Sequence, residues 1–217
     1  MAWKTRYGTG AVFTYRNVID PMIYPLRPRI VRLCIELGVR EILDIASGTG
    51  AQCRMLGQAG IQATGLDLAE AMIATARGLG GNHTDYVLGS ATELPFDNDR
   101  FDACLLLLAL HEHQENERTV MLDEALRVLR TDGHLILAEY QQPANRRSLH
   151  LPWQLIRFIE HAAGGEHRAG FLDFVARGSL SGFLQRHGLG AVREVRSHFG
   201  TIRIVAITAL QERGALI

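Results

Sequence analysis

The sequence has little that would mark a secreted, disulfide-bonded or membrane-spanning protein. Its 217 residues include three cysteines, Cys34, Cys53 and Cys104, at spacings that fit neither a metal site nor an even disulfide framework. The longest apolar run, residues 103–110, is far shorter than the roughly 20 residues needed to cross a bilayer. The N-terminus lacks the apolar core of about 7–15 residues found in secretory signals. We therefore expect a soluble, cytoplasmic protein with reduced thiols and no transmembrane segment.

The sequence also lacks an excess of either charge. It contains 23 basic and 23 acidic residues, with a formal net charge of +0 at pH 7, and no long block of like charges. A chain without a basic surface gains little from releasing the counterions of nucleic acid. We therefore expect a small molecule, and no nucleic acid, as the substrate.

From residue 41 onward, short β-rich segments alternate with helical segments. The expected strands are residues 41–45, 63–67, 86–88, 101–108 and 134–139, and the expected helices are residues 51–59, 69–79 and 116–129. A turn at residues 131–133 is expected to end the last of these helices and begin the fifth strand. This alternation predicts an α/β protein with a parallel sheet and helices on both faces.

The rest of the chain follows a different pattern. The β-rich runs 192–199 and 201–208 are separated only by Gly200, which leaves no room for a crossover helix, so these strands should be antiparallel. The length suits a single domain. We divide it into an N-terminal helical cover (1–40), a cofactor-binding core (41–140), a helical substrate lid (141–190) and terminal antiparallel strands (191–208).

The strongest motif lies where the first expected strand ends, in Leu43-Asp-Ile-Ala-Ser-Gly-Thr-Gly-Ala51. Gly48 and Gly50 allow a sharp turn and a close approach of the backbone to a ligand. Asp67 follows Gly48 by 19 residues, at the end of the second strand, where a carboxylate can accept hydrogen bonds from ribose hydroxyls. Together these features predict a site for an adenosine-containing cofactor.

A nicotinamide dinucleotide fits this motif less well. The third glycine of the G-x-G-x-x-G pattern would fall at Cys53, whose side chain impedes the close helix-to-strand approach used around a pyrophosphate. A nicotinamide-dependent oxidoreductase is therefore one alternative, and a non-catalytic cofactor-binding protein of the same fold is another.

Four blocks in order resemble the class I S-adenosylmethionine-dependent methyltransferases, especially the subgroup with the ubiquinone and menaquinone biosynthesis methyltransferases. The blocks are residues 43–50, 65–68, 89–102 and 127–133, and the resemblance covers roughly residues 40–140. It implies a Rossmann-like, doubly wound, mostly parallel seven-stranded sheet with an antiparallel C-terminal strand pair. It also implies methyl transfer from S-adenosyl-L-methionine to a small molecule, with oxygen, carbon or nitrogen as the accepting atom.

The resemblance further implies which residues hold the cofactor. Gly48 and Gly50 would lie against its methionine part and Asp67 against its ribose, while Ser90 stands where the family usually has an aspartate near the adenine. Apart from the resemblance, Tyr7 and Tyr15 of the N-terminal cover are candidates to fold over the cofactor, with simple packing of these side chains as the alternative. The full set that we predict is Asp44, Ala46, Gly48, Gly50, Asp67, Leu68, Ser90, Ala91, Leu108 and Tyr15.

A general base is needed only if the accepting atom begins protonated. The segment Leu110-His-Glu-His113 follows the fourth strand, so His111 is the first candidate for this base and His113 the second. The alternative is a polar loop whose histidines face solvent. Further along, His161, Glu166 and His167 raise the question of a metal site, but glycines make their spacing loose, and we predict a surface helix end and no metal.

The expected lid carries several large apolar side chains. An insertion after the fifth strand of an open α/β sheet lies over the catalytic edge, so these residues favour an apolar or aromatic acceptor. Completion of the core is the alternative role. The residues are Trp153, Ile156, Phe158, Phe171 and Phe174. A homodimer is the assembly that we consider, although no sequence feature requires it.

Overall fold

The computed structural model describes residues 9–143 and 151–209, and predictions for residues outside these ranges stay untested. The described residues contain a seven-stranded sheet of order β3-β2-β1-β4-β5-β7-β6. Its strands are β1 Glu41–Ile45, β2 Gln62–Asp67, β3 Thr84–Leu88, β4 Phe101–Leu107, β5 Leu129–Tyr140, β6 Arg193–Ser197 and β7 Ile202–Thr208. Strand β7 is antiparallel to both of its neighbours, whereas the first five strands pair in parallel. The predicted fold class is confirmed.

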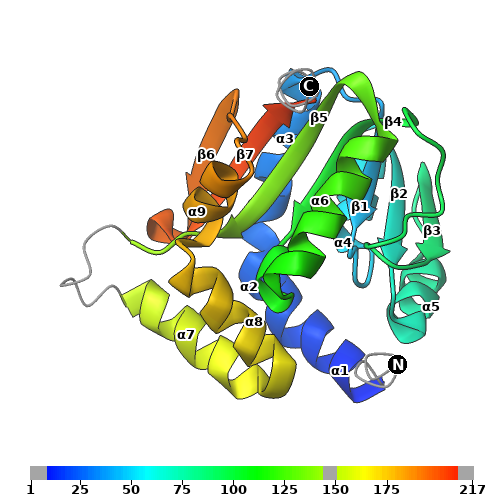
Figure 1. Ribbon diagram of the computed structural model, residues 1–217. Coiled ribbons are helices and arrows are strands. Elements are labelled where there is room, and N and C mark those ends of the chain that lie inside the picture. Colours follow the sequence, from blue (N-terminus) through cyan, green and yellow to red (C-terminus); the bar gives the residue numbers. More distant parts are fainter. Residues whose placement is uncertain (1–8, 144–150, 210–217) are drawn as a thin grey trace.

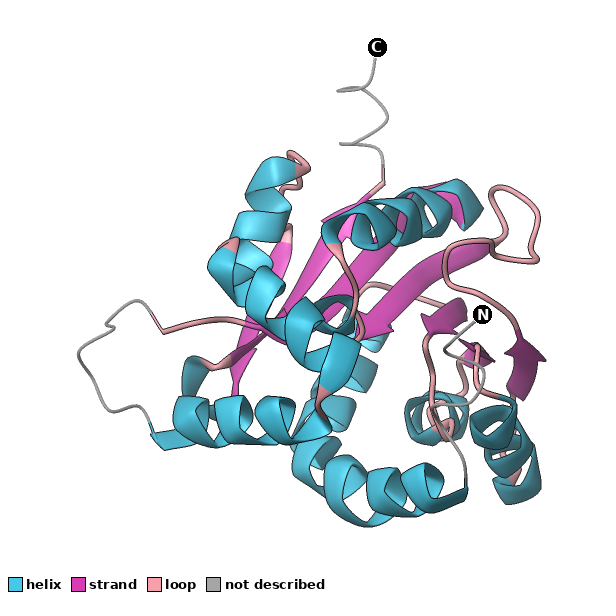
Figure 2. Cartoon of the chain, turned by 60° about the horizontal axis from the view of Figure 1, so that its bottom comes forward, coloured by secondary structure: helices cyan, strands magenta, loops and turns pink. Residues whose placement is uncertain are grey.

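Helices cover both faces of this sheet (Figures 1 and 2). In Figure 1, helix α6 lies in front of the sheet and α3 behind it. The longer helices are α3 Arg27–Glu36, α4 Ala51–Gln58, α5 Glu70–Leu79, α6 Glu115–Val128, α7 Leu151–Ala163, α8 Gly165–Ala176 and α9 Ser179–Arg186. The N-terminal segment consists of α1 Thr9–Thr14, η2 Tyr15–Ile19, α2 Asp20–Ile23 and η3 Tyr24–Leu26. Among the described residues, no helix has the length and apolarity needed to span a membrane.

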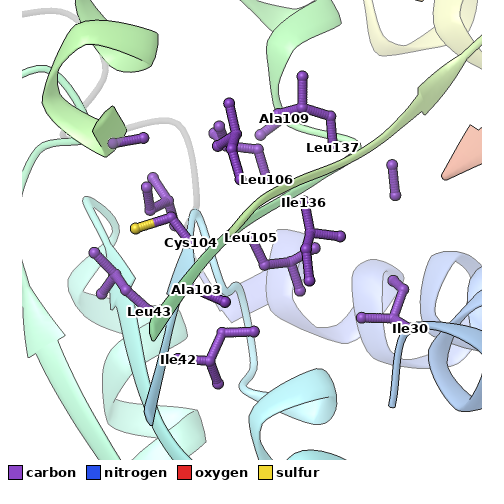
Figure 3. Close-up of a cluster of buried hydrophobic side chains, with 14 of the residues drawn as sticks. Ile30, Ile42, Leu43, Ala103, Cys104, Leu105, Leu106, Ala109, Ile136 and Leu137 are labelled. Carbon is purple, nitrogen blue, oxygen red and sulfur yellow. The ribbon is translucent and has the colours of Figure 1, made fainter. Parts of the chain in front are cut away.

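The core is centred on β1, β4 and β5 (Figure 3). Strand β4 has four consecutive fully buried residues, Ala103, Cys104, Leu105 and Leu106, instead of alternating buried and exposed positions. This pattern arises because helices cover both faces of a parallel sheet. All three cysteines are buried and free, in agreement with the expectation of reduced thiols.

The predicted turn before β5 is wrong. Strand β5 begins at Leu129, so residues 131–133 lie inside it. Phe101 pairs with Leu129 and Ala103 pairs with His134, so only Asp102 lies opposite residues 130–133. A Cβ on Gly133 would lie 3.0 Å from the Asp102 carbonyl oxygen. The glycine that we assigned to a turn instead allows a β-bulge, where the extra residues are accommodated without ending the strand.

The order of the strands defines where a ligand can bind. The chain moves outward from β1 to β3 and then returns to β4 on the other side of β1. Loops that leave the carboxyl ends of β1 and β4 therefore diverge, and open α/β sheets bind ligands at this switch point. After β4 the chain forms the short helix η4, Leu110–Glu112.

One buried cation fastens helix α8 to this edge. Arg118 of α6 is fully buried and donates to the carbonyl oxygens of Leu110, at 2.9 Å, and Gly170, at 2.8 Å. It also pairs with Glu115 and Asp173. Helices α6 and α8 and the loop after β4 are therefore joined through one guanidinium group.

We expect Arg118→Met to lower the free energy of unfolding by about 2–3 kcal/mol, because two buried carbonyl groups would lose their donor. The cost is limited because Glu115 keeps Arg186 and Asp173 keeps Arg177 as partners. Urea denaturation measures the change. The matched control is Arg32→Met, at a side chain 83% exposed, which should shift stability by no more than about 0.5 kcal/mol. Equal effects of the two substitutions would contradict the role of Arg118.

A pair of helical glycines tests the close contact of α8 with η4. A Cβ on Gly170 would lie 2.6 Å from the Glu112 carbonyl oxygen, whereas a Cβ on Gly78 of α5 would meet nothing within 4 Å. Alanine is favoured over glycine in helices by up to about 1 kcal/mol. Gly78→Ala should therefore raise the thermal unfolding temperature, while Gly170→Ala should lower it because α8 has to move. A stabilising Gly170→Ala substitution would show that this contact is not tight.

Candidate functional site

The glycine turn after β1 is tightly packed on both sides. Gly48 and Gly50 have φ values of +55° and +72°, which favour glycine. A Cβ on Gly50 would lie 2.5 Å from the ring of Tyr86, and a Cβ on Gly48 would lie 3.3 Å from the ring of Tyr15. The predicted need for glycine at both positions is thus explained by backbone conformation and by space.

Asp67 ends β2 and holds the glycine turn in place. Its Oδ2 accepts a hydrogen bond from the Gly48 N–H at 2.8 Å, and its Oδ1 accepts one from the Ala69 N–H at 2.9 Å. Burial raises the pKa of this carboxyl, although the backbone N–H groups act in the opposite direction. Each carboxylate oxygen has a second lone pair, so the side chain can still accept hydrogen bonds from a ligand.

Two buried polar atoms beneath the glycine turn have no hydrogen-bond partner among the described residues. They are Asp44 Oδ1 and Ser47 Oγ. Burial raises the pKa of Asp44 to about 7, while a hydrogen bond from the Cys53 thiol and the charge of Arg27 act to lower it. Buried polar groups normally have partners, so atoms without one at a ligand-binding edge fit a ligand that supplies a donor. Ser47 was missed in the sequence, where its place inside the glycine motif was the available signal.

The backbone is strained at the two strand ends that flank the switch point. Ala46, directly after β1, has a φ of 61°, and Leu108, directly after β4, has a φ of 53°. Such conformations are costly for residues other than glycine and are concentrated at functional sites. Both residues belong to the predicted cofactor set, and both lie at the predicted edge.

The remaining predicted cofactor residues lie after neighbouring strands. Leu68 follows β2, and Ser90 and Ala91 follow β3, all three partly exposed. The Ser90 hydroxyl lies 2.8 Å from the Thr92 hydroxyl and accepts a hydrogen bond from the Thr92 N–H at 3.2 Å. Ser90 therefore stabilises its own turn, and its predicted contact with a cofactor stays a prediction.

The N-terminal segment packs onto the glycine turn. Tyr15 lies against Gly48, as described above, and burial raises the pKa of its phenol. The Thr49 hydroxyl donates to Asp20 at 3.0 Å, and Asp20 pairs with Arg27. The predicted position of Tyr15 over the cofactor edge agrees with this arrangement, while its role there stays a prediction.

His111 is buried beside the carboxyl ends of β4 and β5. Its Nδ1 lies 3.1 Å from both carboxylate oxygens of Glu139, the penultimate residue of β5. Its Nε2 lies 3.6 Å from Oε2 of Glu160 in α7. The alternative of a solvent-facing His111 is wrong, because the side chain is 3% exposed. His113 lies apart from this group, with its Nδ1 3.4 Å from Glu117.

His167 of α8 completes the group. Its Nε2 lies 2.5 Å from Glu160 Oε2, and its Nδ1 lies 3.5 Å from Glu112 Oε2. The Tyr140 hydroxyl donates to Glu160 Oε1 at 2.8 Å. We call His111, Glu112, Glu139, Tyr140, Glu160 and His167 the histidine–glutamate cluster. Sequence reasoning missed Glu112 and Glu160, because only tertiary packing brings α7 and α8 against the loop after β4.

In this cluster, neighbouring groups of opposite charge change the pKa values more than burial does. Burial acts to lower the pKa of His167, but Glu112 and Glu160 raise it to about 10. Burial acts to raise the pKa of Glu112, but contacts with His167 and the charge of His111 lower it to about 2. The pKa of His111 is also raised, because Glu139 outweighs burial. A proton on His111 is therefore stabilised here, and its predicted role as a base requires that proton to be lost.

The large apolar residues of the expected lid divide into two groups. Trp153, Phe171 and Phe174 are buried, whereas Phe158 is 72% exposed and Ile156 is partly buried. The Phe171 ring centroid lies 6.3 Å from that of His111 and 5.8 Å from that of Tyr140. Phe171 therefore packs against the histidine–glutamate cluster, whereas Trp153 packs against Phe171 and the Phe174 ring lies 5.0 Å from the Arg118 guanidinium. Phe158 does not belong to this buried group.

Comparison with known proteins matches residues 43–137 to the family described as a methyltransferase domain. A demethylmenaquinone methyltransferase of Clavibacter sepedonicus is 36% identical over 119 residues, which are 54% of this chain and 48% of that protein. The Thermotoga maritima protein of the same name is 33% identical over 125 residues, or 56% and 52% of the two chains. The chain thus spans about half the length of the curated relatives that it matches.

Solved structures share the fold over most of the chain. An O-methyltransferase family protein from Burkholderia thailandensis has a TM-score of 0.70 and 16% identity, covering 93% of this chain and 60% of its own. Magnesium protoporphyrin IX methyltransferase from Synechocystis PCC 6803, solved with bound SAH, has a TM-score of 0.62 and 19% identity, covering 95% and 92%. At these identities the likeness establishes the fold.

The buried carboxyl of Asp44 makes stability depend on pH. Its pKa is raised to about 7 from an ordinary value of 3.8. The stability that the folded chain gains from holding this proton is therefore fully present below pH 3.8 and is lost as the pH rises through about 7. Asp44→Asn removes this loss, and the variant should gain thermal stability over the wild type as the pH increases from 5 to 8. A difference of one between the pKa of the folded and the unfolded chain corresponds to about 1.4 kcal/mol in the free energy of unfolding.

Thermal unfolding without ligand, measured at several pH values, checks this prediction. The matched control is Asp97→Asn, at an exposed aspartate, whose difference from the wild type should not change over the same range. A constant difference between Asp44→Asn and the wild type would show that Asp44 is ionised throughout.

Proposed function

We propose that this chain, whose residues 43–137 match a methyltransferase domain, transfers the methyl group of S-adenosyl-L-methionine to a small-molecule acceptor. The observation that carries this proposal is the joining of Asp67 to the glycine turn at the switch point of the sheet. The match to the methyltransferase domain covers this same region.

The residues at the switch point fit the parts of this cofactor. Asp67 would accept hydrogen bonds from the ribose hydroxyls, and the turn at Gly48 and Gly50 would lie against the methionine part. The buried oxygens of Asp44 and Ser47, which have no hydrogen-bond partner among the described residues, would receive the donors of the amino acid group. Leu68, Ser90 and Ala91 extend the site along the sheet edge, as expected for an adenine.

The chain would contribute mainly positioning to the reaction. The bound cofactor supplies an activated methyl group on a sulfonium, so the protein has to align the accepting atom and exclude water. Tyr15 and the N-terminal segment cover the glycine turn from one side, and helices α7 and α8 form the proposed lid on the other. His111 would act as a base when its proton is removed, and His113 remains the second candidate.

The acceptor in this proposal is apolar or aromatic. Phe171 of the proposed lid supports this choice, because its ring lies beside His111 and Tyr140 and aromatic side chains provide large apolar contact surfaces. The named relatives are demethylmenaquinone methyltransferases, but this chain matches only about half of their length. A cytoplasmic location, supported by three free buried thiols, and a homodimer are also part of the proposal.

A nicotinamide-dependent oxidoreductase fits these residues less well. Cys53 occupies the position of the third dinucleotide glycine, and its Sγ would lie 3.0 Å from a Cβ on Gly65 of β2. The sulfur therefore fills the space between α4 and the sheet that a glycine would leave for close packing.

Isothermal titration calorimetry with S-adenosylhomocysteine tests the proposal. The wild type should bind one equivalent, and Asp67→Asn should weaken binding by about 10- to 100-fold, because the amide replaces one charged acceptor. Asp132→Asn, at an exposed aspartate near the opposite end of β5, should leave the affinity unchanged. Absence of binding by the wild type, together with binding of a nicotinamide dinucleotide, would refute the proposal.

A further inference from the structure

We propose that His111, Glu160 and His167 form a binding site for a divalent transition-metal ion of the Zn²⁺ type. These side chains come from η4, α7 and α8, and each offers one nitrogen or oxygen atom within 4.8 Å of the others. The converging atoms are the two Nε2 atoms and Glu160 Oε2. The prediction of no metal from the sequence considered His161 and Glu166 with His167, which is a different set of residues.

The distances around Glu160 suit a metal ion. Its Oε2 lies 3.6 Å from His111 Nε2 and 2.5 Å from His167 Nε2. Nitrogen and oxygen ligands lie about 2.0–2.2 Å from zinc, so ligands in a tetrahedral site are separated by roughly 3.3 Å. The distance from His111 Nε2 to Glu160 Oε2 is already close to this separation. A small outward movement of His167 would lengthen its distance from Glu160 Oε2 to the same value.

Each proposed ligand is held by a second group. Glu139 lies 3.1 Å from His111 Nδ1, and Glu112 lies 3.5 Å from His167 Nδ1. The Tyr140 hydroxyl donates to Glu160 Oε1 at 2.8 Å, which directs Oε2 toward the histidines. Metal-binding histidines almost always donate their other ring N–H to a carboxylate, carbonyl or water. This arrangement, repeated at both histidines, distinguishes the cluster from an ordinary salt bridge.

Charge and ligand type favour the same class of ion. Three carboxylates, from Glu112, Glu139 and Glu160, surround two imidazole rings in a largely buried space. A divalent cation would carry the same charge as the two imidazole protons that it replaces, so the three carboxylates would stay balanced to the same extent. Two imidazole nitrogens and one carboxylate oxygen suit zinc and its neighbours, whereas magnesium and calcium prefer all-oxygen sites.

The site would also join the lid to the core. His111 belongs to the loop after β4, while Glu160 and His167 belong to the two lid helices, which lie side by side in Figure 1. Three protein ligands leave a fourth position for water or for an oxygen of the acceptor, as in catalytic zinc sites. His111 lies in η4, directly after β4, so the ion would lie at the same carboxyl edge of the sheet as Asp67, which ends β2.

The test uses the full chain, stripped of metal with a chelator and titrated with ZnCl₂ by calorimetry. We expect one equivalent to bind and to raise the thermal unfolding temperature, because the ion would bind only the folded chain. CoCl₂ should give the visible absorption of a four-coordinate cobalt site. His167→Ala should abolish all three responses. Glu139→Gln, which keeps every ligand, should weaken zinc binding by about 10- to 100-fold.

The matched control is His161→Ala, because His161 lies in the same lid segment and instead contacts the Arg157 carbonyl oxygen at 2.8 Å. It should bind zinc as the wild type does. Failure of the wild type to bind one equivalent, or equal affinity in Glu139→Gln and the wild type, would overturn the proposal. Metal binding does not require S-adenosylmethionine, so S-adenosylhomocysteine titration of the same samples separates this proposal from the proposed function.

Discussion

The contact on which the rest of the cofactor edge depends is that between the Asp67 carboxylate and the Gly48 N–H. It connects the end of β2 to the turn after β1, and the second carboxylate oxygen connects to the start of α5 through Ala69. Strand ends in a parallel sheet would otherwise diverge into separate loops. The Asp67 side chain thus fixes the separation of the loops after β1 and β2. The same carboxylate can also contact a ligand.

On the other side of the sheet edge, after β4 and β5, buried charged groups determine how helix α8 packs. Arg118 is fully buried with carbonyl and carboxylate partners, and the histidine–glutamate cluster lies close by, under the same helix α8. Burying such groups is costly unless each has a partner, so α8 can pack here only in one orientation. The buried polar groups therefore specify the position of α8 more strictly than its apolar residues could.

Much of the fold could be predicted from the sequence because its signals are local. The apolar run before Gly48 and the 19 residues from Gly48 to Asp67 are sufficient to place β1, the turn and the end of β2. Residues 131–133 were misassigned because a glycine in a bulge and a glycine in a turn look alike in sequence. Glu160 was missed because its partners His111 and Tyr140 lie far away along the chain, and their proximity depends on tertiary packing.

The contact of Tyr15 with Gly48 has a consequence for the timing of each reaction cycle. The ring lies against the turn that would hold the donor, and Asp20 secures the same segment through Thr49. A donor held by this turn would lie next to this segment, so its release would be coupled to these contacts. Their opening would then be a step of each cycle that is separate from the methyl transfer itself.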